Sequence, residues 1–95
     1  MPRVIVRFFA TAREIARRQS MELEVDTVRE LLETLSLTLG DQFKDGVMDT
    51  ATGGLNRYYS CLVSGKRIDF PGGLDTVLKE GDTVAIFPIV GGGSQ

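Results

Sequence analysis

The 95-residue chain predicts an α+β domain, in which one main helix packs on one face of a mixed sheet of four to five strands. Two observations predict this class. Segments near both ends alternate apolar and polar residues, as half-buried strands do. Between them, one segment repeats its apolar residues at helical spacing. A chain of this length is expected to form a single domain, here residues 1–90, followed by a flexible glycine tail at 91–95.

The composition argues against several classes of function. The chain has no histidine and one cysteine, Cys61, which leaves no internal disulfide and no histidine-based catalysis. The same shortage argues against a metal site, and the net charge of −2 argues against nucleic-acid binding. No apolar stretch approaches the roughly 20 residues of a membrane helix, and the N-terminus does not look like a secretory signal. We therefore expect a cytoplasmic protein that binds no cofactor and is not an enzyme by itself.

The first strand and a short helix are predicted within residues 3–18. Alternate side chains of residues 3–9 are expected to face the core, namely Val4, Val6 and Phe8. The next residues fit a capping box, with Thr11 as the N-cap and Glu14 at the third helical position. This box predicts a helix to about residue 18.

Residues 21–25 alternate strictly and predict a second strand that returns beside the first. A second capping box, Thr27 to Glu30, is expected to start the main helix, and Gly40 to end it. The apolar stripe of this helix consists of Val28, Leu31, Leu32, Leu35 and Leu39. The following stretch, 41–57, predicts only a loose turn or short helix against the core.

Three further strands are predicted at residues 58–63, 66–68 and 83–90, with a sharp corner at 70–74 between the last two. The first and last strands are the most apolar. Pairing them at the centre of the sheet would bury both, which is the arrangement of the ubiquitin-like β-grasp fold. Cys61 alternates with inward-facing residues, so we expect a buried, unreactive thiol.

Two segments near the chain ends carry a family resemblance. Val6 to Glu14 reads VRFFATARE, and Leu78 to Gly93 reads LKEGDTVAIFPIVGGG. They resemble the opening and the ending of the MoaD/ThiS sulfur carriers, particularly the small subunit of molybdopterin synthase. Those proteins close with Phe-Pro-Pro-Val, any residue and Gly-Gly, whereas Ile89 stands here at the second proline. The middle, residues 55–74, resembles the cysteine-synthesis carriers and many archaeal members of the family.

The resemblance implies a carrier whose chemistry resides in its tail. In the family, an adenylyltransferase resembling the ubiquitin-activating enzyme uses ATP to adenylate the terminal glycine, which then becomes a thiocarboxylate and donates its sulfur. Gly93 would carry the activated carboxylate, Gly92 would be its essential neighbour and Gly91 a spacer. Glycine suits this step because a backbone without Cβ atoms passes closely along an enzyme wall.

The predicted acceptor is the large subunit of molybdopterin synthase, on the evidence of the Phe87-Pro88 strand end. This chain would then act as the small subunit of that synthase. Three alternatives stay open. The chain could carry sulfur for cysteine or thiamine synthesis, or it could be a protein modifier joined to target lysines through Gly93. It could also be an interaction domain that transfers nothing.

Ser94 and Gln95 depart from the family pattern, in which the chain stops at Gly-Gly. While they are present, Gly93 carries an amide rather than a carboxylate, and adenylation is blocked. We expect a precursor that a metallopeptidase trims. The alternatives are an expression scar, a glycine run that is only a linker, and a protein that has lost carrier function.

A partner surface is predicted on the sheet face opposite the core. Its apolar members are Phe9, Leu62, Ala85 and Phe87, with Pro88 at the strand end. Exposed apolar patches mark partner surfaces, and in the family this face docks on the activating enzyme and the synthase. The alternative is that residues 41–57 cover both aromatic rings. Basic residues are expected to rim the patch and steer an acidic partner, or to be solvated strand charges: Arg7, Lys66 and Arg67.

Overall fold

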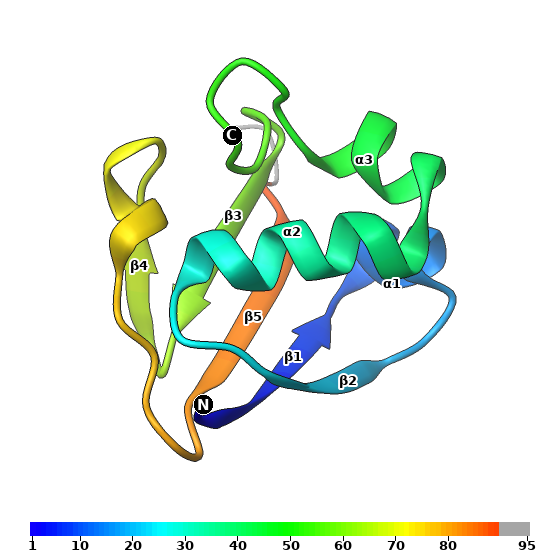
Figure 1. Ribbon diagram of the computed structural model, residues 1–95. Coiled ribbons are helices and arrows are strands. Elements are labelled where there is room, and N and C mark those ends of the chain that lie inside the picture. The colour runs from blue at the N-terminus through cyan, green and yellow to red at the C-terminus, as the bar shows by residue number, and fades with distance from the viewer. Residues whose placement is uncertain (90–95) are drawn as a thin grey trace.

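The computed structural model describes residues 1–89, which form one five-stranded mixed sheet with helices packed against it (Figure 1). The strands are β1 (Arg3–Phe8), β2 (Ser20–Glu24), β3 (Tyr59–Val63), β4 (Lys66–Ile68) and β5 (Thr83–Pro88). Their order across the sheet is β2-β1-β5-β3-β4. β1 and β5 pair in parallel at the centre, and the other pairs are antiparallel. The predicted central pairing of the first and last strands is confirmed.

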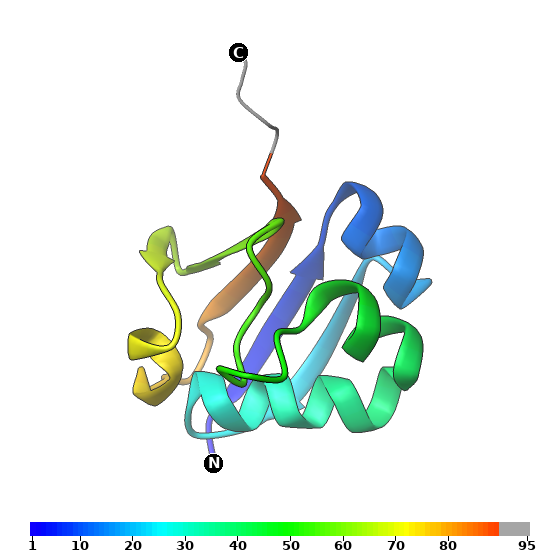
Figure 2. The same ribbon diagram turned by 90° about the horizontal axis from the view of Figure 1, so that it is seen from above.

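The helices are α1 (Ala10–Ala16), α2 (Val28–Leu39), α3 (Asp41–Val47) and a 3-10 turn, η1 (Gly72–Asp75). The long helix α2 crosses the sheet on one face, and α3 returns above it (Figures 1 and 2). This is the ubiquitin-like β-grasp fold that the sequence predicted. No helix within residues 1–89 is both long and apolar enough to cross a membrane.

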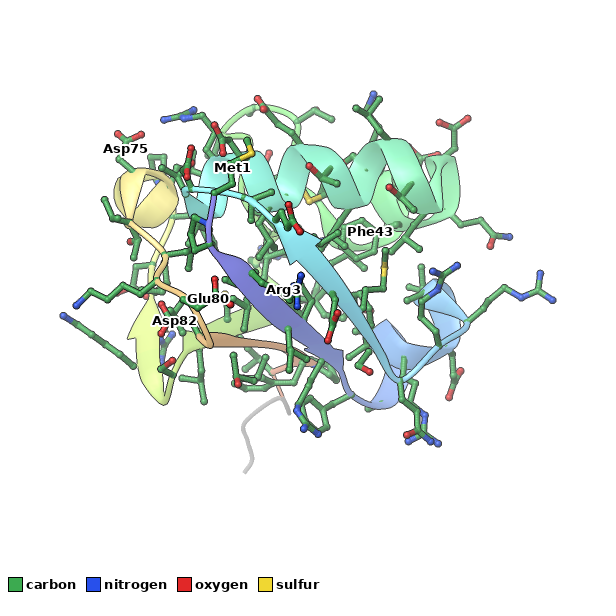
Figure 3. The ribbon with its side chains drawn as sticks, turned by 60° about the horizontal axis from the view of Figure 1, so that its bottom comes forward. Met1, Arg3, Phe43, Asp75, Glu80 and Asp82 are labelled. Atoms are coloured by element: carbon green, nitrogen blue, oxygen red, sulfur yellow. The ribbon has the colours of Figure 1, made fainter. Side chains whose placement is uncertain are left out.

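The core lies between α2 and the sheet. The predicted inward residues of β1 are buried, and so are four of the five stripe residues of α2, while Leu39 is half-buried. Phe43 of α3 points into this interior, where its ring meets the edge of Phe8 at 6.3 Å between centroids (Figure 3). Burying such a ring contributes about 1.5–3 kcal/mol. Cys61 is fully buried beside these residues, as expected.

The segment that the sequence left open forms α3 and a compact loop. Phe43 and Val47 are buried and anchor α3 to the core, because they lie four residues apart on one face of this short helix. The loop then returns along the β4 side of the molecule, where Gly54 packs directly against the ring of Phe70. This placement leaves residues 41–57 on the helix side of the sheet.

The capping box predicted at Thr11 is wrong. The first helix begins two residues earlier, after Phe9, and has no side-chain cap. Thr11 is therefore inside the first turn, and its hydroxyl bonds instead to the hydroxyl of Tyr59 at 2.9 Å. The helix also ends at Ala16 rather than near residue 18, because Arg17 adopts a left-handed conformation with φ of 61°.

The capping box predicted at Thr27 is confirmed, with one difference. The Thr27 hydroxyl accepts from the Glu30 N–H at 3.2 Å. The Glu30 carboxylate reaches one residue further back than expected and accepts from the Asp26 N–H at 2.8 Å. Gly40 ends the helix with φ of 82°, a conformation that glycine adopts without the steric cost of a Cβ.

Candidate docking site at the end of the last strand

The end of β5 is anchored on both sides. On one side, the Phe9 N–H donates to the Ile86 carbonyl at 3.0 Å. On the other side, the Ile89 N–H donates to the Tyr58 carbonyl at 2.8 Å. The end of β5 and Ile89 are therefore held at the centre of the sheet by the segments on both sides, and Figure 2 shows β5 between β1 and β3.

Four side chains form a row across the face of the sheet opposite α2, which we call the outer face. Arg7 of β1 is the register partner of Ala85 in β5. Ala85 is also opposite Leu62 of β3, which in turn is opposite Arg67 of β4. Register partners point to the same face, so the structure brings together the apolar pair and places one arginine at each end of it.

The two predicted aromatic residues lie nearer the chain exit on the same face. Phe9 extends β1 by one residue, and its backbone bond to Ile86 places it beside Phe87. Phe9 is 45% exposed and Phe87 is half-buried. The alternative interpretation, that residues 41–57 cover both aromatic rings, is wrong for Phe9, which is exposed, whereas Phe87 keeps only part of its surface exposed.

Two residues of the predicted surface lie elsewhere. Pro88 is the register partner of Tyr59 and so points to the helix side of the sheet, not to the outer face. Lys66 is the register partner of Val63, a core residue. It therefore lies on the helix side and does not rim the outer face, contrary to the expectation. Both positions have one cause: strand residues alternate sides, so Pro88 cannot share the face of Phe87, nor Lys66 that of Arg67.

The one cysteine of the sequence is a buried free thiol. Cys61 faces the core, opposite Ile86 and Ile68. Burial disfavours the thiolate and raises the pKa of this thiol to about 12, so it stays protonated at neutral pH. Residues 1–89 gather no group of three or more acidic or cysteine side chains that could hold a metal ion.

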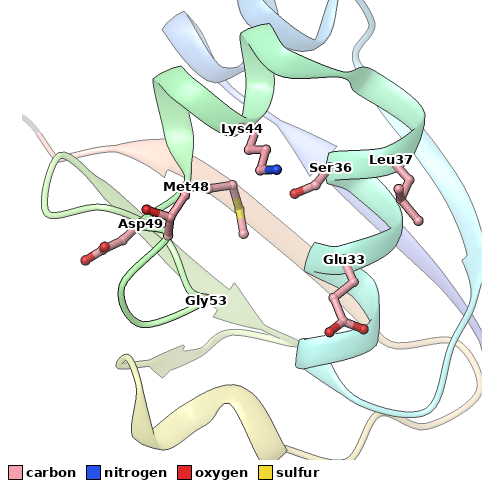
Figure 4. A pocket seen from close by; sticks show the side chains of 8 residues that line it. Glu33, Ser36, Leu37, Lys44, Met48, Asp49 and Gly53 are labelled. Carbon is pink, nitrogen blue, oxygen red and sulfur yellow. The ribbon is translucent and has the colours of Figure 1, made fainter.

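A hollow of about 540 Å³ lies between α2 and the segment 44–53. Glu33, Ser36 and Leu37 line it from α2, and Met48 projects into it from the facing segment (Figure 4). Leu37 is 86% exposed there. This hollow lies on the helix side, away from the outer face.

The comparison with known families decides the identity. The sequence model of the ThiS family matches residues 6–93, nearly the whole chain. The chain belongs to the ThiS family. This is a family of ubiquitin-like sulfur carriers and modifiers, as the resemblance at both chain ends implied.

Individual relatives of this ThiS-family protein support the same conclusion. Small archaeal modifier protein 3 of Haloferax volcanii is 32% identical over 91 residues, covering 93% of this chain and 96% of the relative. The solution structure of small archaeal modifier protein 1 from Methanosarcina acetivorans has a TM-score of 0.78 at 28% identity, with 98% of each chain covered. A chain in the Amycolatopsis orientalis BexX/CysO complex has a TM-score of 0.75 at 27% identity, covering 95% of this chain and 99% of that one.

The glycines that the resemblance marks as the reactive tail, Gly91, Gly92 and Gly93, lie outside the described residues, as do Ser94 and Gln95. What residues 1–89 provide is the exit of β5 and the surface around it. Two residues of this surface, Arg57 and Ser60, were not predicted from the sequence. Arg57 stacks on Tyr58 with its guanidinium carbon 5.0 Å from the ring centroid, and Ser60 is a buried polar residue. Neither belongs to a recognisable motif: Arg57 contacts the residue next to it in the sequence, and Ser60 lies opposite Phe87 of another strand.

Proposed function

We propose that this ThiS-family protein is a sulfur carrier whose Gly93 carboxylate is adenylated and then converted to a thiocarboxylate. Because residues follow Gly93, the proposal includes their removal by a peptidase before activation. A ubiquitin-activating-enzyme-like adenylyltransferase would supply the ATP-dependent step. The chain itself would supply a reactive end and a surface to hold it in place.

One observation supports this proposal most directly. β5 is held on both sides up to Ile89, and the last residues of this strand border an uncovered apolar face. An enzyme that binds Phe9 and Phe87 on this face would find the exit of the tail at a fixed position. A partner surface next to a reactive end lowers the entropy cost of bringing that end into a channel.

The proposed sulfur acceptor is the precursor of molybdopterin, held by the large subunit of molybdopterin synthase. The Phe87-Pro88 strand end supports this choice over the cysteine and thiamine acceptors. A second candidate function is protein modification, in which Gly93 is joined to a target lysine. The 32% identity to small archaeal modifier protein 3 favours this candidate. The carrier and the modifier would share the adenylation step. They would differ only in the nucleophile that then attacks the Gly93 carbonyl.

The first test uses two forms of the chain, one that ends at Gly93 and one that retains Ser94 and Gln95. Each is incubated with ATP and the adenylating enzyme of the same organism, and ATP–pyrophosphate exchange is measured. We expect exchange with the first form only. Exchange with neither form would refute activation at Gly93.

The second test decides between carrier and modifier. The chain is purified from its own host, and its intact mass is measured. Replacement of one oxygen by sulfur at Gly93 supports the carrier, and Gly-Gly remnants on lysines of other proteins support the modifier. Incubation of the thiocarboxylate form with the synthase large subunit and the pterin precursor then tests the molybdopterin acceptor. No product in that reaction would exclude the proposed acceptor and leave the carrier role intact.

A further inference from the structure

A small polar notch lies beside Ile89, at the border of the apolar outer face. It has a volume of about 210 Å³ and sits where the start of β3, the end of β4 and Ile89 meet. Its polar lining includes Arg57, Ser60, Arg67 and Asp69. We call these residues together with Ile89 the arginine notch. Because Ile89 is the last described residue before the tail, the notch adjoins the position where the tail begins.

Both arginines of the notch retain unused hydrogen-bond donors. A guanidinium group has five N–H groups in a planar fork. Arg57 Nη2 donates to the Tyr58 hydroxyl at 3.0 Å, and Arg67 Nε donates to Asp69 at 3.3 Å. The remaining nitrogens of each group make no bond among residues 1–89. Both side chains are exposed, so these donors are accessible to a partner.

Ser60 adds a second, independent observation. It is the one polar residue of the described chain that is buried, at 9% exposure, and it lines the notch. It lies opposite Phe87 on the outer face, so the notch directly borders the apolar surface, and one partner could contact both. Asn56, also in the lining, is occupied: it donates to the Gly46 carbonyl at 3.0 Å and accepts from the Tyr58 N–H at 2.9 Å.

The charge and the size of the notch define its ligand. Two guanidinium groups and one carboxylate leave a net charge of +1, in a chain whose total is −2. An anion with one negative charge would neutralise it. The volume of about 210 Å³ is below the roughly 300–1,000 Å³ of pockets for nucleotides and other small ligands, but it suffices for one side chain.

We propose that the arginine notch receives an aspartate or glutamate side chain of the adenylating enzyme, which locks the carrier in register at the start of its tail. This inference rests on the proposed function. The carboxylate accepts N–H bonds from Arg57 and Arg67, with the Ser60 hydroxyl as a further donor. Charged pairs of this kind fix the orientation of a complex and are stronger than neutral hydrogen bonds.

The test measures KM and kcat of ATP–pyrophosphate exchange for the carrier that ends at Gly93. In the variant Arg57→Glu/Arg67→Glu we expect KM for the carrier to rise at least about tenfold while kcat changes little, because binding and not chemistry is lost. Ser60→Ala should give a smaller rise in KM. The matched control is Lys44→Glu/Lys79→Glu, which makes the same change of net charge at two exposed residues outside the notch and should leave KM near that of the unmodified carrier.

An unchanged KM in the arginine variant, or an equal rise in the lysine control, overturns the notch as a specific site. Exchange that is absent even with the unmodified carrier overturns the proposed function, and this inference with it. Circular dichroism checks that each variant folds. If the glutamate variant does not, Arg57→Gln/Arg67→Gln replaces it, and the expected result is a raised KM that depends less on salt concentration than that of the unmodified carrier.

Discussion

The hydroxyls of Thr11 and Tyr59 are hydrogen-bonded at 2.9 Å, although 48 positions separate them in the sequence. Thr11 belongs to α1, which follows β1, and Tyr59 starts β3. β5 lies between these two strands. The bond therefore joins both flanks of the strand that leads to the tail, on the side opposite Phe9 and Phe87.

We expect Tyr59→Phe to lower the free energy of unfolding by about 1 kcal/mol or less, because it removes one exposed hydrogen bond and keeps the ring. Thr11→Val should have a similar effect. The double variant should lose no more than the larger single loss, since both changes remove the same bond. Urea titration measures all three. Losses that simply add would mean that the two hydroxyls do not interact.

Two phenylalanines on opposite faces should respond differently to replacement by alanine. Phe8 is 2% exposed and packs in the core, so Phe8→Ala should cost about 3–5 kcal/mol of folding free energy. Phe87 lies half-buried on the outer face, so Phe87→Ala should cost much less and instead raise KM for the carrier in the exchange assay. Thermal melts and kinetics on the same samples separate these effects. A stability loss for Phe87→Ala as large as that for Phe8→Ala would place Phe87 in the core.

Adjacent glycines offer a matched pair. A Cβ on Gly73 would overlap Cγ2 of Ile68, whereas a Cβ on Gly72 would have no atom within 4 Å. Neither has the left-handed backbone that alanine avoids. We therefore expect Gly73→Ala to cost about 1–3 kcal/mol through overpacking and Gly72→Ala to be almost neutral. Equal midpoints of urea unfolding for the two variants would contradict the close packing at Gly73.

The buried thiol predicts a pH dependence of stability. Burial raises the pKa of Cys61 from 9.0 to about 12. The unfolded chain therefore loses this proton first as the pH rises, and stability falls between about pH 9 and 12. The slope approaches 1.4 kcal/mol per pH unit from this group. Cys61→Ala should remove this component, which parallel urea titrations of both proteins over that range would measure; identical slopes would refute it.

Local patterns in the sequence were enough to predict the buried faces of β1 and α2 and the ends of α2, because these depend on residues close together in the chain. The alternation of Val4, Val6 and Phe8 determined which side of β1 is buried, since strand side chains change face at every residue. The helical spacing from Val28 to Leu35 determined the inner face of α2, and Thr27 and Gly40 determined where this helix begins and ends. The pattern at Thr11 was misleading because a capping sequence acts only if the helix starts at that residue, and here α1 starts at Ala10.

The sequence by itself determined the fold class, the inward faces of the central strands and the family, because each follows from local periodicity or from a contiguous motif. Only the tertiary structure decided what surrounds the end of β5. The bond from Thr11 to Tyr59, the apolar row from Ala85 to Leu62 and the notch between Arg57 and Arg67 all join different elements. Such contacts depend on strand order, register and twist, and these are set by the packing of the whole domain.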